Sequence, residues 1–359
     1  MLPAHVQPEV VELDATFRAI DAGTSLDGRL VEYFTAAWPA YRRWYLSQGE
    51  AARPTYAECA TNLRRYMPEL ADTYDRLVEA VGGGDLEARF LSHWNPPPLF
   101  AACSLLTYSR ERHVLVRNYD YPPLLCDNTV LASSWHGAKV LAMTDCLWGA
   151  LDGLNEHGLS VAIAFGGRPV VGEGFGIGLV VRYVLEFARS VPEALAILRR
   201  VPVQLTYNIA LVDASGASAI VYVAPDREPV VSGVSTAGNR QGPTVWPEHA
   251  EFCATVPREH AMAEAIAEPA LGVGDLVDRF LQAPIYRSTA TSTWGTVYTA
   301  VYDTDARVLE LAWPDDRWAL SLHAFEEGER SRRTLVAVPP PVYQPAPEPV
   351  PEHPPVLIA

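Results

Sequence analysis

The sequence predicts an α+β protein in which antiparallel sheets are covered by helices. Apolar residues recur at helical spacing through residues 26–92, and three consecutive prolines at 96–98 end that block. From residue 99 onward, pairs of β-branched runs are joined by short turns, with helical segments between them. Such hairpins imply antiparallel pairing, and the intervening helices are expected to cover a face of a sheet.

The N-terminal block is expected to be helical. Residues 29–48 and 63–81 place aromatic and aliphatic side chains three and four positions apart, and three glycines at 82–84 stop the second segment. A short helix is expected over 85–94. The triple proline that follows can neither continue a helix nor enter a central strand, so the chain is expected to be extended there.

The remainder is expected to alternate between strand pairs and helices. A helix over 179–201 is expected to break and restart near Pro192, and Gly158 supplies the left-handed position of a turn within 155–158. The proline-rich tail beyond residue 338 is expected to be unpacked. The expected strands are 99–109, 113–120, two within 146–165, two within 206–224, 296–304 and 307–313, and the later helices are 260–268 and 272–282.

Charge and hydropathy exclude two classes of partner. The formal net charge is −15 and no basic cluster offsets it, so binding to a nucleic-acid backbone is not expected. No apolar run reaches the roughly 18–20 residues of a membrane span, so no membrane partner is expected. The first residues lack a basic segment followed by an apolar one, which makes a cytoplasmic location the default expectation.

The cysteines and histidines do not form a metal-binding pattern. The five cysteines are widely spaced without a CxxC pair, and the nine histidines show no ligand spacing. No metal site is therefore expected, and each cysteine is expected to be a free thiol.

Cys103 is the strongest candidate for chemistry. If the hairpin turn is centred on residues 110–111, the residue numbers of two cross-strand partners add up to about 221. Cys103 then faces roughly Asn118, with Arg117 and Asp120 close by. A nearby cation lowers the pKa of a thiol and increases the thiolate fraction. The simpler alternative is a buried cysteine beside a surface ion pair.

A nucleophilic Cys103 would need a base, and no histidine stands at a spacing typical of cysteine proteases. A free α-amino group, with an ordinary pKa of about 7.7–8.0, would serve. That amine would exist only if the chain were cut between Ala102 and Cys103.

The ordered motifs resemble the acyl-coenzyme A:isopenicillin N (6-aminopenicillanic acid) acyltransferase family of cysteine N-terminal nucleophile (Ntn) hydrolases, relatives of the choloylglycine hydrolases. The resemblance rests on their order and spacing over residues 65–325 rather than on any single motif. The motifs are Cys103 followed by Arg117-Asn118-x-Asp120, Gly153-Leu-Asn-Glu-x-Gly-Leu159, Phe165-Gly-Gly167, the helix 182–194, the strand pair ending at 208–213, and Asn239.

The resemblance implies a four-layer αββα sandwich and a precursor that cuts itself before Cys103. Residues 1–102 would be a helical prosegment or small subunit, residues 103–337 the Ntn-hydrolase catalytic domain, and residues 338–359 a proline-rich tail. The two fragments would stay together as a heterodimer, with further assembly left open.

The resemblance also implies roles for individual residues. Cys103 would be the nucleophile, Arg117 and Asp120 would contact its amine or the substrate, and Asn239 would help to bind the oxyanion. The family commonly has Thr-Asn-His around this asparagine, whereas this chain has Gly238-Asn239-Arg240. The residues expected to bind substrate are Tyr119, Phe165 and Gly166.

The expected function is a self-processing amidohydrolase or acyltransferase that acts on the amide bond of a small N-acyl molecule through a thioester at Cys103. No cofactor is expected, although acyl-coenzyme A is a candidate acyl donor. Two alternatives stay open: a pure acyltransferase that uses an acyl thioester, and an uncleaved, non-catalytic relative that binds a small ligand in the same pocket.

Overall fold

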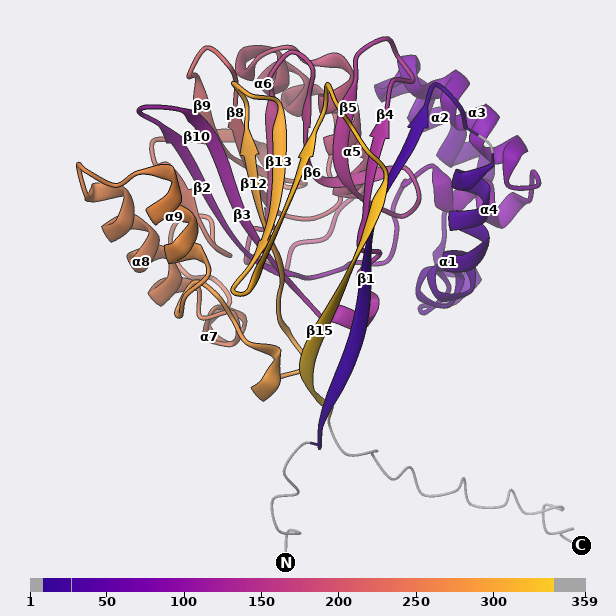
Figure 1. The fold of residues 1–359 in the computed structure, drawn as a ribbon. Coiled ribbons are helices and arrows are strands. Elements are labelled where there is room, and N and C mark those ends of the chain that lie inside the picture. Colours follow the sequence, from indigo (N-terminus) through magenta and orange to yellow (C-terminus); the bar gives the residue numbers. More distant parts are fainter. Residues whose placement is uncertain (1–8, 27, 339–359) are drawn as a thin grey trace, which may run out of the picture.

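Two sheets stacked face to face form the centre of the computed structural model, which describes residues 9–26 and 28–338 (Figure 1). Every pairing between neighbouring strands is antiparallel except that of β1 with β4. The nine-stranded sheet has the order β10 (Arg227–Ser232), β9 (Ser218–Ala224), β8 (Tyr207–Val212), β7 (Ser160–Phe165), β6 (Gly149–Asn155), β5 (Val140–Asp145), β4 (Thr129–Ser133), β1 (Glu9–Gly23) and β15 (Gly328–Val338). The six-stranded sheet has the order β11 (Thr236–Ala237), β2 (Ala102–Ser109), β3 (His113–Tyr121), β12 (Gly295–Asp303), β13 (Val308–Trp313) and β14 (Asp316–Ser321).

Helices cover the outer face of each sheet, which confirms the expected four-layer αββα order. Helix α5 (Ile177–Phe187) packs on β6 and β7, and α6 (Val191–Arg200) packs on β8, β9 and β10. Helix α5 is buried along almost its whole length because its residues are mostly apolar, and Pro192 starts α6 as expected. On the opposite side, α7 (Pro247–Phe252) leads into α8 (Thr255–Ala267) and α9 (Val273–Phe280), and these last two cover β2 and β3.

The N-terminal helices lie together at one side of the sandwich, away from α7–α9 (Figure 1). They are α1 (Arg29–Tyr45), α2 (Tyr56–Tyr66), α3 (Ala71–Ala80) and α4 (Asp85–Leu91). Thr55 and Glu58 form a capping box that fixes the start of α2. Phe90 of α4 packs against the rings of Phe34, Trp38 and Tyr41 on α1, which joins these two helices.

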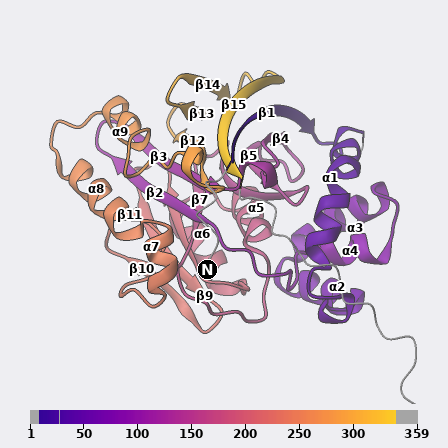
Figure 2. The same ribbon diagram turned by 90° about the horizontal axis from the view of Figure 1, so that it is seen from below.

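The N-terminal segment also contains a long strand that sequence analysis missed. Strand β1 pairs antiparallel with β15 and parallel with β4, so it lies inside the nine-stranded sheet (Figure 2). Its sequence alternates between Leu13, Ala15, Phe17 and Ala19 on one face and mainly charged residues on the other. That alternation is typical of a half-buried strand. The described part of residues 1–102 is therefore helical only from residue 29 to residue 91.

Other differences from expectation lie in the loops and near the C-terminal end. Strand β4 lies in a stretch where no element was expected, and β5, β10, β11, β14 and β15 were also not expected. The tail beyond residue 338 lies outside the described residues. Within the described part of the chain, no helix is long and apolar enough to cross a bilayer.

Candidate active site

The register of the β2–β3 hairpin decides which side chains accompany Cys103. Cys103 pairs with Tyr119, and Leu105 pairs with Arg117, so the expected pairing with Asn118 is wrong by one residue. Residues that pair directly share a face, and side chains alternate along each strand. Cys103, Arg117 and Tyr119 therefore face the nine-stranded sheet, whereas Asp120 faces the helices that cover β2 and β3.

The Cys103 side chain lies between the two sheets. It is buried, and it lines a cavity together with Arg117 and Tyr119. The Arg117 Nη2 donates a hydrogen bond to the Cys103 Sγ at 3.4 Å. Burial raises the pKa of the Cys103 thiol, the Arg117 charge lowers it, and the charge of Asp120 raises it; the net direction is upward. The thiol is therefore held beside a cation but still needs a base to become a thiolate.

Arg117 is fixed by a partner that sequence analysis missed. Its guanidinium forms an ion pair with Asp152 of β6, which links the two sheets through their buried interior. Asp152 also accepts hydrogen bonds from the hydroxyls of Tyr298, at 2.8 Å, and Tyr302, both on β12. The Arg117 guanidinium lies over the Tyr119 ring, 4.6 Å from its centroid. A single carboxylate within a mostly apolar strand was the available signal, because a buried charge requires a partner.

Asn239 lies directly beside the peptide bond before Cys103. Its Oδ1 accepts the backbone N–H of Cys103 at 3.1 Å, and its Nδ2 donates to the carbonyls of Phe165 at 2.9 Å and Ala101 at 3.4 Å. The expected proximity of Asn239 and Cys103 is therefore present in the fold, in spite of the unusual residues on either side of Asn239.

The loop that carries Asn239 is itself held by side chains and by a glycine. The Asn208 Nδ2 donates to the carbonyls of Gly238, at 2.8 Å, and Arg240, at 2.9 Å. Gly167 approaches the loop so closely that a Cβ there would lie 1.9 Å from the Asn239 carbonyl oxygen, and its φ is +69°. Only glycine fits at this position.

Asp120 is close in the chain to the site but has partners on the outer face. Its carboxylate accepts a hydrogen bond from the Thr296 hydroxyl at 2.7 Å and forms a 2.8 Å ion pair with Arg258 of α8. Both charged side chains are fully buried. Asp120 pairs with Ala102 across the hairpin, so its backbone adjoins the residue whose carbonyl precedes Cys103.

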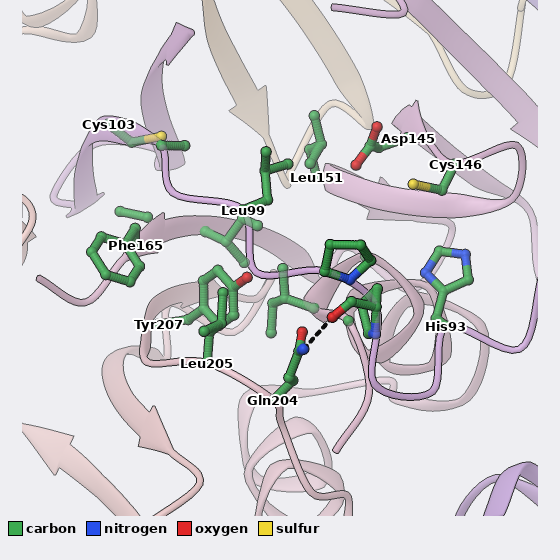
Figure 3. A pocket seen from close by; sticks show the side chains of 18 of the residues that line it. His93, Leu99, Cys103, Asp145, Cys146, Leu151, Phe165, Gln204, Leu205 and Tyr207 are labelled. Atoms are coloured by element: carbon green, nitrogen blue, oxygen red, sulfur yellow. Dashed lines mark hydrogen bonds between the residues drawn. The ribbon is translucent and has the colours of Figure 1, made fainter. Parts of the chain in front are cut away.

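The cavity extends from Cys103 toward His93, which lies just beyond α4 (Figure 3). Tyr119 and Phe165, both expected to bind substrate, line it. Gly166 does not line it; a Cβ there would meet the Gln241 amide instead. Within the described residues, no group of three histidine, cysteine, aspartate or glutamate side chains could hold a metal ion. The site thus combines a thiol, a fixed guanidinium and a side-chain amide beside one peptide bond.

Comparison with known proteins gives one family match. Residues 107–236 match the sequence model of the acyl-coenzyme A:6-aminopenicillanic acid acyl-transferase family. The match covers less than half of the chain, beginning four residues after Cys103 and ending before Asn239; it includes Arg117 and Asp152. It confirms the resemblance found in the sequence and the expectation that the chain is an enzyme. No curated protein matches the sequence.

Two solved structures have a similar arrangement of elements. The conjugated bile acid hydrolase from Clostridium perfringens aligns at a TM-score of 0.44 and 13% identity, covering 64% of this chain and 96% of its own. Penicillin V acylase from Agrobacterium tumefaciens aligns at a TM-score of 0.44 and 13% identity, covering 62% of this chain and 86% of its own.

Proposed function

We propose that this chain is a self-processing cysteine Ntn hydrolase or acyltransferase that acts on the amide bond of a small N-acyl molecule. Cys103 is the nucleophile, and the α-amine released by cleavage after Ala102 is its base. The proposal rests on the contacts of Cys103. Arg117 contacts the Cys103 thiol, and Asn239 accepts the Cys103 N–H, the amide that cleavage would convert into the amine.

Self-cleavage would begin at the thiol. The Cys103 Sγ attacks the carbonyl carbon of Ala102, the carbon–nitrogen bond breaks, and the thiol proton passes to the departing nitrogen, which becomes the α-amine. The Ala102 carbonyl is then held as a thioester. Water hydrolyses the thioester, giving the Ala102 carboxylate and regenerating the thiol.

The same groups would then act on a substrate amide. The α-amine takes the thiol proton as the sulfur attacks the substrate carbonyl, and the amine product leaves with a proton. An acyl thioester forms at Cys103, and water or an amine acceptor removes the acyl group. Asn239 is proposed to turn its side-chain amide, which now donates to the carbonyls of Phe165 and Ala101, toward the oxyanion. Such a donor is typically worth about 10²–10³ in rate.

Asp120 is proposed to help position the new amine indirectly, because its backbone pairs with Ala102 while its side chain faces away from the thiol. Its carboxylate is held by Arg258 and Thr296, so its contribution would be to orient the cleaved end of β2. The two fragments are proposed to remain a heterodimer, because β1 lies between β4 and β15.

The test is the mass of the purified protein under denaturing conditions. We expect two fragments that meet at Ala102 and Cys103, and one uncut chain for Cys103→Ala. Cys59→Ala is the matched control: Cys59 is also a buried free thiol, but it lies in α2, so this variant should cleave normally. A single full-length mass for the unmodified protein would overturn the proposal and favour the non-catalytic binding protein.

Product analysis then separates the two reaction types. Incubation of an N-acyl amide with and without an added amine shows whether water or an amine accepts the acyl group. Supplying the acyl group as its coenzyme A thioester tests whether acyl-coenzyme A is a donor.

A further inference from the structure

The lining of the cavity beside Cys103, called the catalytic cavity below, is mostly apolar, and much of it comes from the N-terminal segment. Leu151, Ile177 and Leu205 line it from the part of the chain that follows Cys103. In Figure 3, Leu99 and Leu151 lie between Cys103 at one end and Asp145 at the other. The apolar side chains that line it from residues before the proposed cleavage site are Trp44, Phe90, Pro96, Pro97, Leu99 and Ala101, and His93 is the polar one.

The described residues that line this cavity supply no free positive charge. Arg117 is already paired with Asp152. Burial lowers the pKa of His93 to about 4, so the imidazole is neutral near pH 7. The Asp145 carboxylate lines the end away from Cys103. An anionic group on a bound molecule would therefore lose its hydration without gaining a partner.

A second cavity adjoins the first. Four residues line both cavities and so form a partition between them: Trp44, Leu99, Asp145 and Cys146. Leu124 and Leu125 also line the second cavity, and they are 69% and 64% exposed. Two leucines exposed side by side give this cavity an apolar rim.

We propose that the catalytic cavity takes the acyl part of the substrate as an uncharged, apolar chain, and that Trp44 sets the maximum chain length by closing the cavity toward its neighbour. This inference rests on the proposed function, because it assigns the acyl group of that reaction. Trp44 would thus be a specificity-determining residue supplied by the N-terminal segment. An acyl-coenzyme A donor would have to keep its phosphates outside both cavities.

The test uses coumarinyl amides of butanoic, octanoic, dodecanoic and hexadecanoic acids, with matched acyl groups that end in a carboxylate. For the unmodified protein, we expect kcat/KM to fall beyond a limiting length, and the carboxylate-ended amides to react at least about tenfold more slowly. Trp44→Ala should raise kcat/KM for the longest amide relative to octanoyl by about tenfold or more, and Trp44→Phe should give a smaller shift. Tyr66→Ala is the control. Tyr66 is an aromatic residue of the same N-terminal segment, but it lines neither cavity, so its loss should leave the dependence of kcat/KM on chain length unchanged.

Binding measured on Cys103→Ala separates failure of this inference from failure of the proposed function. Uncharged fatty amides of the same lengths should bind, with a length limit that Trp44→Ala removes when it is added to Cys103→Ala. Two results would overturn the inference even if the enzyme cleaves itself and hydrolyses amides. One is tighter binding of the carboxylate-ended chains, and the other is a dependence on chain length that Trp44→Ala does not change. Length-limited binding without self-cleavage would overturn the proposed function alone.

Discussion

Arg117 and Asp152 form a charged pair across the interior of the sandwich, and the stability of the fold depends on both members being present. Each side chain is almost completely inaccessible to solvent. Removing one member of a buried pair leaves the other charge without compensation, which typically costs about 3–5 kcal/mol. The pair also holds the guanidinium where it contacts the Cys103 sulfur, so its loss affects both stability and chemistry.

We therefore expect Asp152→Asn to lower the free energy of unfolding by about 3–5 kcal/mol. It should also slow self-cleavage by up to about 100-fold, because Arg117 loses its fixed position. Urea unfolding and the time course of fragment formation measure the two effects. Asp226→Asn breaks the more exposed pair with Arg168 and should cost about 1 kcal/mol or less without slowing cleavage. Equal effects of the two variants would argue against the role given to Asp152.

At the scale of elements, strand β1 ties the N-terminal segment to the catalytic sheets. Phe17 on this strand is buried and meets the rings of Tyr298 and Trp313 edge-on, at centroid distances of 6.2 and 4.9 Å. Tyr298 also contacts Asp152, so the strand packs directly behind the network that holds Arg117.

Phe17→Ala should lower the free energy of unfolding by about 3–5 kcal/mol, since it removes a large buried side chain and leaves a cavity. Arg18→Ala is the neighbouring control. Arg18 points to solvent and pairs with exposed Glu329, so its loss should cost about 1 kcal/mol or less. Chemical denaturation measures both values, and a small effect of Phe17→Ala would mean that β1 is not anchored through this contact.

At the scale of the whole molecule, a pair of carboxylates joins the N-terminal helices to the larger sheet. Asp127 accepts hydrogen bonds from the hydroxyls of Tyr33 and Tyr41 on α1, and Tyr41 also donates to Asp145 at 2.9 Å. Burial and then the charge of Asp145 raise the pKa of Asp127 from 3.8 to about 7. Burial also raises the pKa of Asp145.

This raised pKa makes stability depend on pH. Between pH 3.8 and about 7 the folded chain keeps a proton on Asp127 that the unfolded chain releases. The contribution of Asp127 to the free energy of unfolding therefore falls as pH rises through this range and becomes constant above it. We expect Asp127→Asn to flatten this part of the profile, measured by urea unfolding below and above neutrality. Asp14→Asn, at an exposed position, should keep the original slope, and an unchanged slope in Asp127→Asn would contradict the assignment.

The sequence by itself determined the types of most elements, because helical and strand periodicities are local. It also singled out Cys103, Arg117 and Asn239, which the fold brings together. It could not determine the register of the β2–β3 hairpin to one residue, and a slip of one residue exchanges the two faces of a strand. Only the tertiary structure therefore placed Arg117, rather than Asp120, on the same face as the thiol.

The partners of these residues come from distant parts of the chain and were decided by packing alone. Asp152 meets Arg117 because two separate sheets stack, and β1 meets β15 across almost the whole length of the described chain. The assignment of Trp44 to the cavity wall likewise requires the N-terminal helices to be positioned against the sandwich. Periodicity reports which face of an element is buried, whereas the identity of what covers that face depends on contacts that no local pattern encodes.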